Sequence, residues 1–513
     1  MGESLLASRI ENLRASIRRD PIVWAIALTL AIIELALSNR YDKFCNELYF
    51  IDCGRHPAFG YPDAPPLVSL IAAASQLFGD RTWMVRLPTI ASAIALIFLV
   101  AAFARELGGN RSAVWMAALA AAIAPAFLLN GAILSTQSFE PLTWTACGYL
   151  LFRAAYREDR RAALWVGIIA GIAMEAKYGI GGWALGLAAG ILLTPTRRVL
   201  RYPQLWYGAI IGIAIAAPSL IWQAMHGFPL AVSAGYSAKY LNLTGTPLQF
   251  ALQQIRAMNV ALAPMWMAGI IAPFVSARLR EARFLAIAFV VTVAIFFGVH
   301  GKEYYDHAAY PTMFAAGAVA CATWNRWARR ALVTCAIAVS IVLAPTILPI
   351  LDPPTLARYL EIPHVRAPEF ERQGIGAPLT IFFSNELGWR ELEKRVADVY
   401  WSLPDEERAH ASIITADYAE AAAIDVYGRE DGLPPVICLQ FAYYVWGDHG
   451  YDGSVNIVVR GNQRMLRTEC ARNELVGRFG VPYAMSFENG DLMICRGLRV
   501  PFETIWRSNR LHF

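Results

Sequence analysis

One segment near the start of the chain concentrates side chains that can move a proton and hold an anion. It lies between two apolar runs, at about residues 39–84, and residues 41–66 alone hold four carboxylates, two aromatic clusters and several cations. The residues with the most useful chemistry are Asn46, Glu47, Arg55, His56 and Asp63. A carboxylate can take a proton from an acceptor group while cations stabilise a departing anion. A solvated loop with a few ion pairs would have a similar composition, so the place of the segment in the chain matters.

Three further polar clusters lie at the ends of apolar runs. Glu140 starts one run, and Lys177 lies close to Glu175 between two others. The third cluster, at residues 300–307, includes Lys302, Tyr304 and Tyr305. Ionisable groups at membrane depth are costly and are usually functional. Each cluster alone is equally consistent with Lys and Tyr anchoring the chain at an interface. We favour function because all three fall on the same predicted side as residues 39–84.

Composition sets the class of protein. Of the 513 residues, 57% are hydrophobic and 17% charged, whereas soluble domains have about 25% charged residues. The charged fraction is about 13% before Asp352 and about 25% from there on. This excludes a disordered chain and argues against an ordinary soluble enzyme. A net charge of +5 gives no reason to expect a nucleic-acid partner. The sequence predicts a membrane-embedded body, residues 1–351, followed by a soluble tail, residues 352–513.

The body contains about eleven runs long enough to cross a membrane. They lie at about 21–38, 84–104, 112–133, 139–156, 162–176, 178–194, 205–223, 259–276, 284–300, 306–324 and 331–350. Nineteen arginines flank every second connection, N-terminus included, which marks those connections as cytoplasmic. An inside N-terminus and eleven crossings place the tail outside. The shorter run at 65–79, with two prolines near its start, predicts an interfacial helix.

The tail alternates strand-like and helix-like runs, which predicts a small α/β domain. We expect strands at 379–383, 411–415 and 455–459 and helices at 386–401 and 418–426. An outside location permits disulfides. A bond between Cys45 and Cys53 is one possibility, and pairing among Cys438, Cys470 and Cys495 stays open.

Short motifs over most of the chain resemble one known family. Asn46-Glu-Leu-Tyr-Phe50 and Cys53-Gly-Arg-His56 are similar to its Asp-Glu-Leu-Tyr-Tyr/Phe and Cys-Gly-Xaa-His runs, and Gly60-Tyr-Pro-Asp-Ala-Pro-Pro-Leu67 is similar to its Gly-Tyr-Xaa-Asp-Xaa-Pro-Pro-Leu run. Further matches occur at 78–80, 85–88, 138–141, 177–178, 194–198, 301–305, 309–311, 418–421, 425–428, 433–434 and 446–447. The chain resembles the polytopic inverting glycosyltransferases of the C superfamily (GT-C). Within them it is most similar to bacterial glycosyltransferase family 39, the protein-mannosyltransferase-like group related to lipid A aminoarabinose transferases.

The resemblance implies a GT-C fold in the bacterial inner membrane, with a cytoplasmic N-terminus and a periplasmic C-terminal α/β domain. It implies a sugar donor carried on a polyprenyl phosphate. The sugar would pass, with inversion, to a lipid, glycan or protein acceptor on the outer face. A lipid-linked donor needs an apolar groove for its tail and cations for its phosphate. The acceptor hydroxyl needs a base within hydrogen-bond reach.

One departure from the family pattern affects the chemistry. The family usually has Asp where this chain has Asn46, and an amide cannot take a proton at neutral pH. Asp63 or Glu47 could serve as the base instead. Alternatively, the acceptor is already an anion and needs no base, or this copy has lost or changed its activity.

These observations define a candidate site. Asp63 and Glu47 would act as base or orient the acceptor, and Asn46 would hold the acceptor. Donor binding would fall to Arg55, His56, Lys177, Lys302, Tyr304, Tyr305 and Glu140. We expect no obligate cofactor, although Glu47, Asp63 and Glu140 could assemble a divalent-cation site. A transporter or flippase of lipid-linked sugars and a catalytically silent scaffold are the alternative functions.

Overall fold

The computed structural model describes residues 19–508, except residues 78, 244, 367, 368, 370, 372, 373, 462–465, 467 and 486–488. Three of the arginines expected on the cytoplasmic side, Arg9, Arg14 and Arg18, lie outside the described residues. The chain forms two compact units, each built from separate stretches of sequence. The first comprises residues 1–38, 86–217 and 244–350. The second comprises residues 39–85, 218–243 and 351–513.

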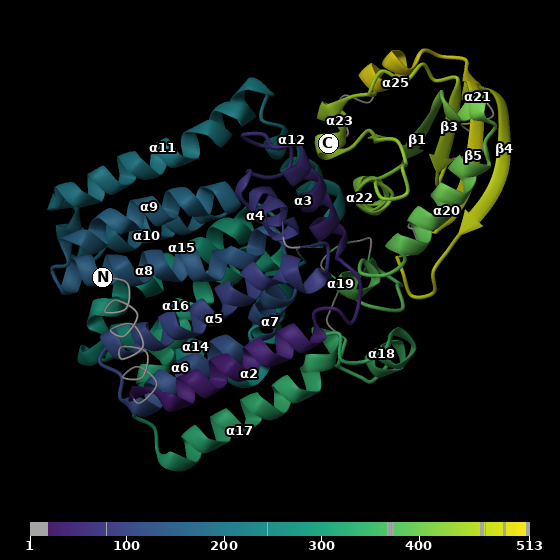
Figure 1. The fold of residues 1–513 in the computed structure, drawn as a ribbon. Helices are drawn as coiled ribbons and strands as arrows, with labels where there is room; N and C mark the ends of the chain where they lie inside the picture. The colour runs from purple at the N-terminus through teal and green to yellow at the C-terminus, as the bar shows by residue number, and fades with distance from the viewer. Residues whose placement is uncertain are drawn as a thin grey trace, which may run out of the picture. The chain divides into compact units, whose positions relative to one another are not determined.

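The first unit is helical throughout its described part (Figure 1). Its helices are α2 (Pro21–Leu37), most of α5 (Thr82–Glu106), α6 (Arg111–Ile123), α7 (Pro125–Ala132), α8 (Glu140–Tyr156), α9 (Arg160–Ala176), α10 (Ile180–Leu192), most of α11 (Pro203–Met225), α13 (Pro247–Ala257), α14 (Ala263–Val275), α15 (Arg283–Gly298), α16 (Tyr310–Cys321) and α17 (Arg326–Leu343). Helices α14 and α16 approach closely because glycines face each other. A side chain on Gly317 would collide with the carbonyl oxygen of Met265. Such small-residue contacts are typical of helix packing in membranes.

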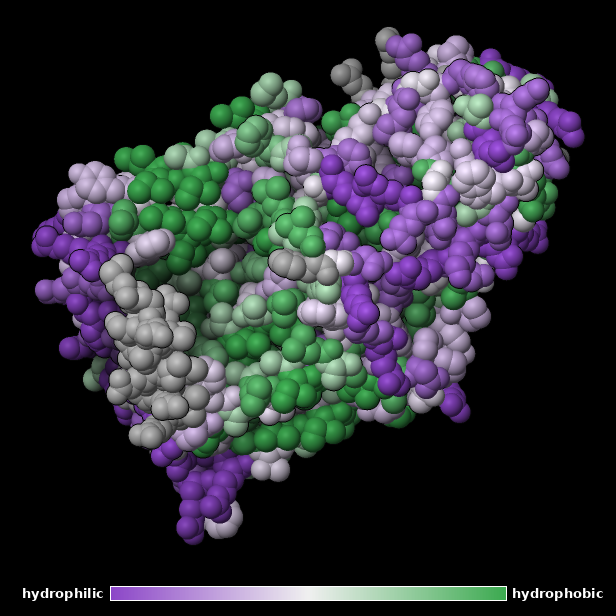
Figure 2. All heavy atoms as spheres, viewed as in Figure 1, coloured by the Kyte–Doolittle hydropathy of each residue, from purple (hydrophilic) through white to green (hydrophobic). Residues whose placement is uncertain are grey.

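Several of these helices are suited to a membrane. By length and composition, four described helical segments could cross one: α5, α11, the segment Ala277–Gly298 that contains α15, and the segment Arg326–Thr346 that contains α17. The number rises to six if the bent pairs α6–α7 and α13–α14 each count as one span. Figure 2 shows hydrophobic side chains gathered over α2, α11 and α17. The chain is therefore a membrane protein with several apolar helices, and the count of eleven spans stays a prediction.

The second unit combines helices with one sheet. Its helices are α3 (Cys45–Arg55), α4 (Leu67–Gln76), α12 (Pro229–Tyr236), α18 (Pro353–Leu360), α19 (Ile381–Ser384), α20 (Trp389–Ser402), α21 (Asp405–Arg408), α22 (Tyr418–Tyr427), α23 (Phe441–Trp446) and α25 (Phe502–Ser508). Its strands are β1 (Ala411–Thr415), β2 (Val436–Cys438), β3 (Val455–Val459), β4 (Cys470–Phe479) and β5 (Gly490–Leu498). The strand order is β2-β1-β3-β5-β4. The first three strands are parallel, and β5 and β4 add an antiparallel edge.

The structure agrees with some predicted tail elements and corrects one. Strands β1 and β3 have the predicted bounds, and α20 and α22 lie within a few residues of theirs. The strand predicted at 379–383 is wrong, because residues 381–384 form the short helix α19. Leu379 and Phe383 are buried against Leu356 and Leu360 of α18 instead of pairing with a strand. A short apolar run does not distinguish a buried strand from a buried helical turn by its pattern.

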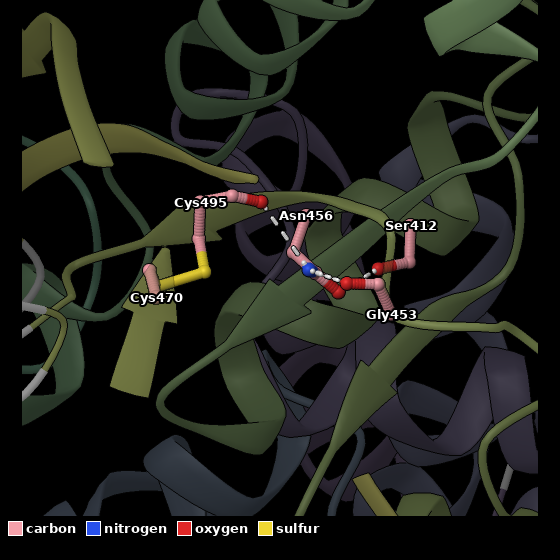
Figure 3. Close-up of a disulfide and its surroundings, with 5 residues drawn as sticks. All are labelled: Ser412, Gly453, Asn456, Cys470 and Cys495. Atoms are coloured by element: carbon pink, nitrogen blue, oxygen red, sulfur yellow. Dashed lines mark hydrogen bonds between the residues drawn. A yellow bond between two sulfur atoms is a disulfide. The ribbon is translucent and has the colours of Figure 1, made fainter. Parts of the chain in front are cut away.

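The cysteines pair in the tail and not in the first loop. Cys45 and Cys53 are both free and buried, because they lie eight residues apart on α3. At 1.5 Å per residue their separation of about 12 Å is too large for a disulfide. Cys470 and Cys495 are bonded across β4 and β5 (Figure 3). Next to that bond, Asn456 Nδ2 donates to the carbonyl oxygen of Cys495 at 3.3 Å, which ties β3 to β5.

This pairing predicts the number of reactive thiols in the purified protein. The chain has eight cysteines, and six of them are free in the structure. We expect maleimide labelling of the denatured protein to find six thiols before reduction and eight after it. A Cys470→Ser variant should show seven under both conditions, because its partner loses the bond. Eight thiols in the unreduced natural chain, purified without reductant, would contradict the disulfide.

Candidate functional site

The helix α3 carries three of the predicted acceptor-side and donor-side residues and begins with a buried carboxylate. Glu47 Oε2 accepts a hydrogen bond from the backbone N–H of Phe44 at 2.8 Å. This bond satisfies a donor that the start of a helix leaves without a partner. The Glu47 side chain is completely buried. Its burial and its bond to the helix start favour a structural role over proton transfer.

Asn46, the next residue back, is half-buried and points toward the C-terminal part of the same unit. Its Oδ1 accepts a hydrogen bond from the hydroxyl of Tyr418 at 2.8 Å. The thiol of Cys45 donates to the same oxygen at 3.6 Å. Tyr418 is the first residue of α22, directly after β1. Tyr418, 372 positions further along the chain, therefore contacts Asn46, the residue that departs from the family pattern.

Asp63 lies in the turn after α3, and the pKa of its carboxylate is higher than usual. Its Oδ1 accepts a hydrogen bond from the hydroxyl of Tyr49 at 2.6 Å. The burial of the carboxylate raises the pKa of Asp63 to about 6, and the bond from Tyr49 opposes part of this rise. The turn is held by Tyr61, whose hydroxyl donates to the carbonyl oxygen of Cys53 at 2.7 Å. A carboxylate with a pKa near the working pH is suited to act as a general base.

Aromatic rings form the immediate surroundings of Asn46 and Asp63. The Tyr49 ring lies 5.3 Å from that of Tyr418 and 6.0 Å from that of Phe441, measured between centroids. Tyr418 and Phe441 lie 4.8 Å apart in an edge-on arrangement. Tyr49 connects this aromatic cluster to Asp63, and burial of that carboxylate is the physical reason for its raised pKa.

Arg55 and His56 lie at the other end of α3. Nine residues separate Arg55 from Asn46, which is about 13 Å along the helix axis. Arg55 Nη1 donates to the backbone carbonyl of Asp425 at 3.0 Å. The His56 ring lies 4.2 Å from the ring of Trp446. The structure thus uses both residues to hold α3 to the C-terminal segment, and it does not bring them to the Asn46 end of the helix.

The first unit contains a second cluster, formed by the remaining predicted residues. Lys177 follows α9, and its Nζ lies 3.2 Å from Oε2 of Glu140, the first residue of α8. The same Nζ lies 4.5 Å from the ring centre of Tyr305 and 5.5 Å from that of Tyr304. Lys302 Nζ is 5.8 Å from the Tyr304 ring. The structure therefore assembles all five residues, with a cation held between a carboxylate and aromatic faces.

Sequence reasoning did not assign roles to Tyr49 and Tyr418, which donate the two hydrogen bonds that define the first cluster. Both residues lie within stretches that resemble the family, so a signal was present. Their partners could not be identified, because hydrogen-bond pairing over such a distance has no periodic pattern. Within the described ranges, no group of three or more His, Cys, Asp or Glu side chains is placed to hold a metal ion.

Comparisons with known proteins identify the class. Residues 63–222 match the profile of the dolichyl-phosphate-mannose-protein mannosyltransferase family. The crystal structure of ArnT from Cupriavidus metallidurans bound to undecaprenyl phosphate is similar, with a TM-score of 0.61 and 14% identity over 93% of this chain and 98% of that one. Its apo form gives the same score and identity over 94% and 98%. The chain therefore has the GT-C fold.

A more distant similarity is to the oligosaccharyltransferase AglB from Archaeoglobus fulgidus in complex with an inhibitory peptide and a dolichol phosphate. Its TM-score is 0.44, with 14% identity over 79% of this chain and 63% of that one. No curated protein sequence matches the chain. The family profile and the ArnT fold together confirm the resemblance drawn from the motifs: this is a GT-C protein similar to glycosyltransferase family 39.

The contact between Tyr49 and Asp63 generates a prediction about acidity. The hydrogen bond from Tyr49 lowers the pKa of Asp63, so Tyr49→Phe should move that pKa further above about 6. Infrared difference spectra between Tyr49→Phe and Tyr49→Phe/Asp63→Asn isolate the carboxyl band and follow its titration. Tyr443→Phe is the matched control, because its hydroxyl donates to Asp52 and not to Asp63. A midpoint that stays the same or falls in Tyr49→Phe would refute this coupling.

Proposed function

We propose that this protein is an inverting glycosyltransferase. It moves a sugar from a polyprenyl-phosphate donor to a lipid, glycan or protein acceptor on the periplasmic face of the bacterial inner membrane. The observation that carries the proposal is a carboxylate with a pKa of about 6, Asp63, close to the aromatic cluster that holds Asn46, in a protein with the GT-C fold. This arrangement suits the removal of a proton from an acceptor hydroxyl.

The acceptor side is built on α3. Asp63 takes the proton from the acceptor hydroxyl as its oxygen attacks the anomeric carbon. The bond from that carbon to the phosphate oxygen breaks, and polyprenyl phosphate leaves with the electron pair. Attack from the face opposite the leaving group inverts the configuration. Asn46 binds and orients the acceptor, and Glu47 holds the start of the helix that carries it.

The donor side is built on the cluster around Lys177. The ammonium groups of Lys177 and Lys302 attract the donor phosphate, and the rings of Tyr304 and Tyr305 line the sugar site together with Glu140. Lys177 also pairs with Glu140, which neutralises that buried carboxylate. Arg55 and His56, expected from the sequence to bind donor, contact the C-terminal segment instead, so we leave them out of this site.

The topology that this function requires is also a proposal. Residues 1–351 would cross the membrane about eleven times, and residues 352–513 would form a soluble periplasmic α/β domain. The nineteen arginines on alternate connections support this orientation. The disulfide between Cys470 and Cys495 supports it independently, because such bonds persist in oxidising compartments.

One assay separates this function from its alternatives. Radiolabelled undecaprenyl-phosphate sugars are incubated with the purified protein in vesicles and with membrane extract as acceptor. Label transferred to lipid, glycan or protein supports the transferase, whereas label that only crosses the vesicle membrane supports a transporter or flippase. No transfer and no transport would leave the silent scaffold, for which Asn46 is the motivating observation.

The proposed role of Asp63 predicts a large loss of activity in Asp63→Asn. We expect turnover to fall at least about 100-fold, the scale of losing acid–base help. Membrane insertion should be unchanged. Asp80→Asn removes an exposed carboxylate from the same loop and serves as the control. Near-normal transfer by Asp63→Asn, measured in the same vesicles, would remove Asp63 from the mechanism.

The proposed role of Lys177 predicts a selective loss of donor use. Replacing it by Ala removes a charged contact, so the apparent KM for the lipid-linked sugar should rise roughly 10-fold to 100-fold. The apparent KM for the acceptor should stay nearly constant. Lys239→Ala, which removes a lysine from a different part of the chain, controls for net charge. If only acceptor affinity changes, the phosphate assignment is wrong.

A further inference from the structure

The carboxamide of Asn46 has one occupied end and one open end. Two donors converge on its oxygen: the hydroxyl of Tyr418 and the thiol of Cys45. No side chain or backbone group in the part of the chain that the structure describes accepts a hydrogen bond from its Nδ2. The residue is only half-buried, so this amino group can be reached. An amide nitrogen carries two hydrogens and can only donate.

Tyr418 is held firmly in the position from which it reaches Asn46. Its backbone N–H donates to Oε1 of Gln440 at 3.2 Å, and Asp417 caps the helix that it begins. Its ring packs against those of Tyr49 and Phe441. The residue also lies at the carboxyl end of β1, where parallel sheets usually place their binding residues. Residues of the C-terminal segment therefore help to fix the position of the Tyr418 hydroxyl relative to α3.

The two converging donors also set which way round the amide lies. If the carboxamide turned by 180°, its Nδ2 would face the hydroxyl hydrogen of Tyr418 and the thiol hydrogen of Cys45. The Tyr418 hydroxyl could then accept a hydrogen bond from Nδ2, but its own hydrogen would no longer have Oδ1 as an acceptor. A donor that is shielded from water and has no acceptor is destabilising. The observed orientation, with oxygen toward Tyr418 and nitrogen outward, is therefore the stable one.

We propose that Tyr418 is a positioning residue that locks Asn46 with its amino group facing the acceptor. Asn46 then binds an oxygen lone pair of the acceptor group, which leaves the acceptor's own proton free to go to Asp63. The C-terminal segment thus completes the acceptor site, although it supplies no base. This inference rests on the proposed function and deepens it. It identifies the group recognised at residue 46 as a hydrogen-bond acceptor, such as a hydroxyl, phosphate or carboxylate oxygen.

The first test is Tyr418→Phe, which removes one hydroxyl and keeps the ring packing. Transfer from a radiolabelled undecaprenyl-phosphate sugar to membrane extract should lose about 10-fold in kcat, because one positioning hydrogen bond is gone. The apparent KM for the donor should not change. The pH midpoint should not move either, since an amide does not titrate. Tyr443→Phe, which removes another hydroxyl from the same aromatic cluster, should leave kcat nearly unchanged.

The second test compares Tyr418→Phe in different backgrounds at residue 46. In Asn46→Ala the hydroxyl has no partner, so its removal should have no further effect. In Asn46→Asp the hydroxyl would stabilise a carboxylate, so its removal should shift the acid limb of the pH profile to higher pH. A general structural role would lower activity equally in all backgrounds, and that result would overturn the proposal.

The third measurement does not depend on activity. In protein labelled with ¹⁵N-asparagine, the side-chain signal that disappears in Asn46→Asp belongs to Asn46. We expect this signal to shift in Tyr418→Phe and to stay in place in Tyr443→Phe. An unchanged signal in Tyr418→Phe would refute the proposal whatever the activity. A shifted signal in a protein that transfers no sugar would instead reject the proposed function and keep the contact.

Discussion

Hydrogen bonds donated by tyrosine hydroxyls organise the unit that holds the proposed acceptor side. Four of them end on side chains of the first loop: Tyr427 on Asp42, Tyr418 on Asn46, Tyr443 on Asp52 and Tyr49 on Asp63. Asp42 lies just before α3, and Asn46 and Asp52 lie on it, so three tyrosines of the C-terminal segment attach to this short stretch of chain. A phenol brings a large apolar surface together with one donor, which is why it can bury a carboxylate without a full opposing charge. The resulting low-dielectric setting explains the raised pKa values of both Asp52 and Asp63.

Much of the fold could be predicted because it follows from local pattern. Apolar runs predicted the helices of the body, and short apolar runs predicted β1 and β3, whose residues are mostly buried. The strand β4 was missed because its exposed middle has no apolar face to recognise. The turn at α19 was misjudged because four apolar residues fit either structure. The predicted residues around Lys177 lie near one another in the structure, and they stood out in the sequence because ionisable groups at the ends of apolar helices are conspicuous.

The acceptor side could be predicted only in outline. Asn46 and Asp63 stand out by residue type, but their hydrogen-bond partners are determined by tertiary packing. Arg55 shows why residue type alone is not enough. A cation near a carboxylate-rich loop suggests phosphate binding, but the Arg55 guanidinium donates a hydrogen bond to the backbone carbonyl of Asp425. An amide at residue 46 also has an electrostatic consequence. A carboxylate there would repel the one on Asp63 and favour its protonated form. With the neutral amide, the pKa of Asp63 is set by burial, the Tyr49 hydroxyl and a backbone hydrogen bond.

Asn46 and Tyr418 are 372 positions apart in the sequence, so they are also synthesised at different times. Chains are made at about 5–20 residues per second, so α3 emerges roughly 20–75 seconds before the residue that completes its polar face. During that interval Asp52 lacks the hydroxyl of Tyr443 and Asn46 lacks that of Tyr418, so the helix cannot reach its final environment. The body of helices can assemble first from contacts close in sequence. The proposed acceptor side is therefore among the last parts of this protein to form, because it needs residues that are synthesised late.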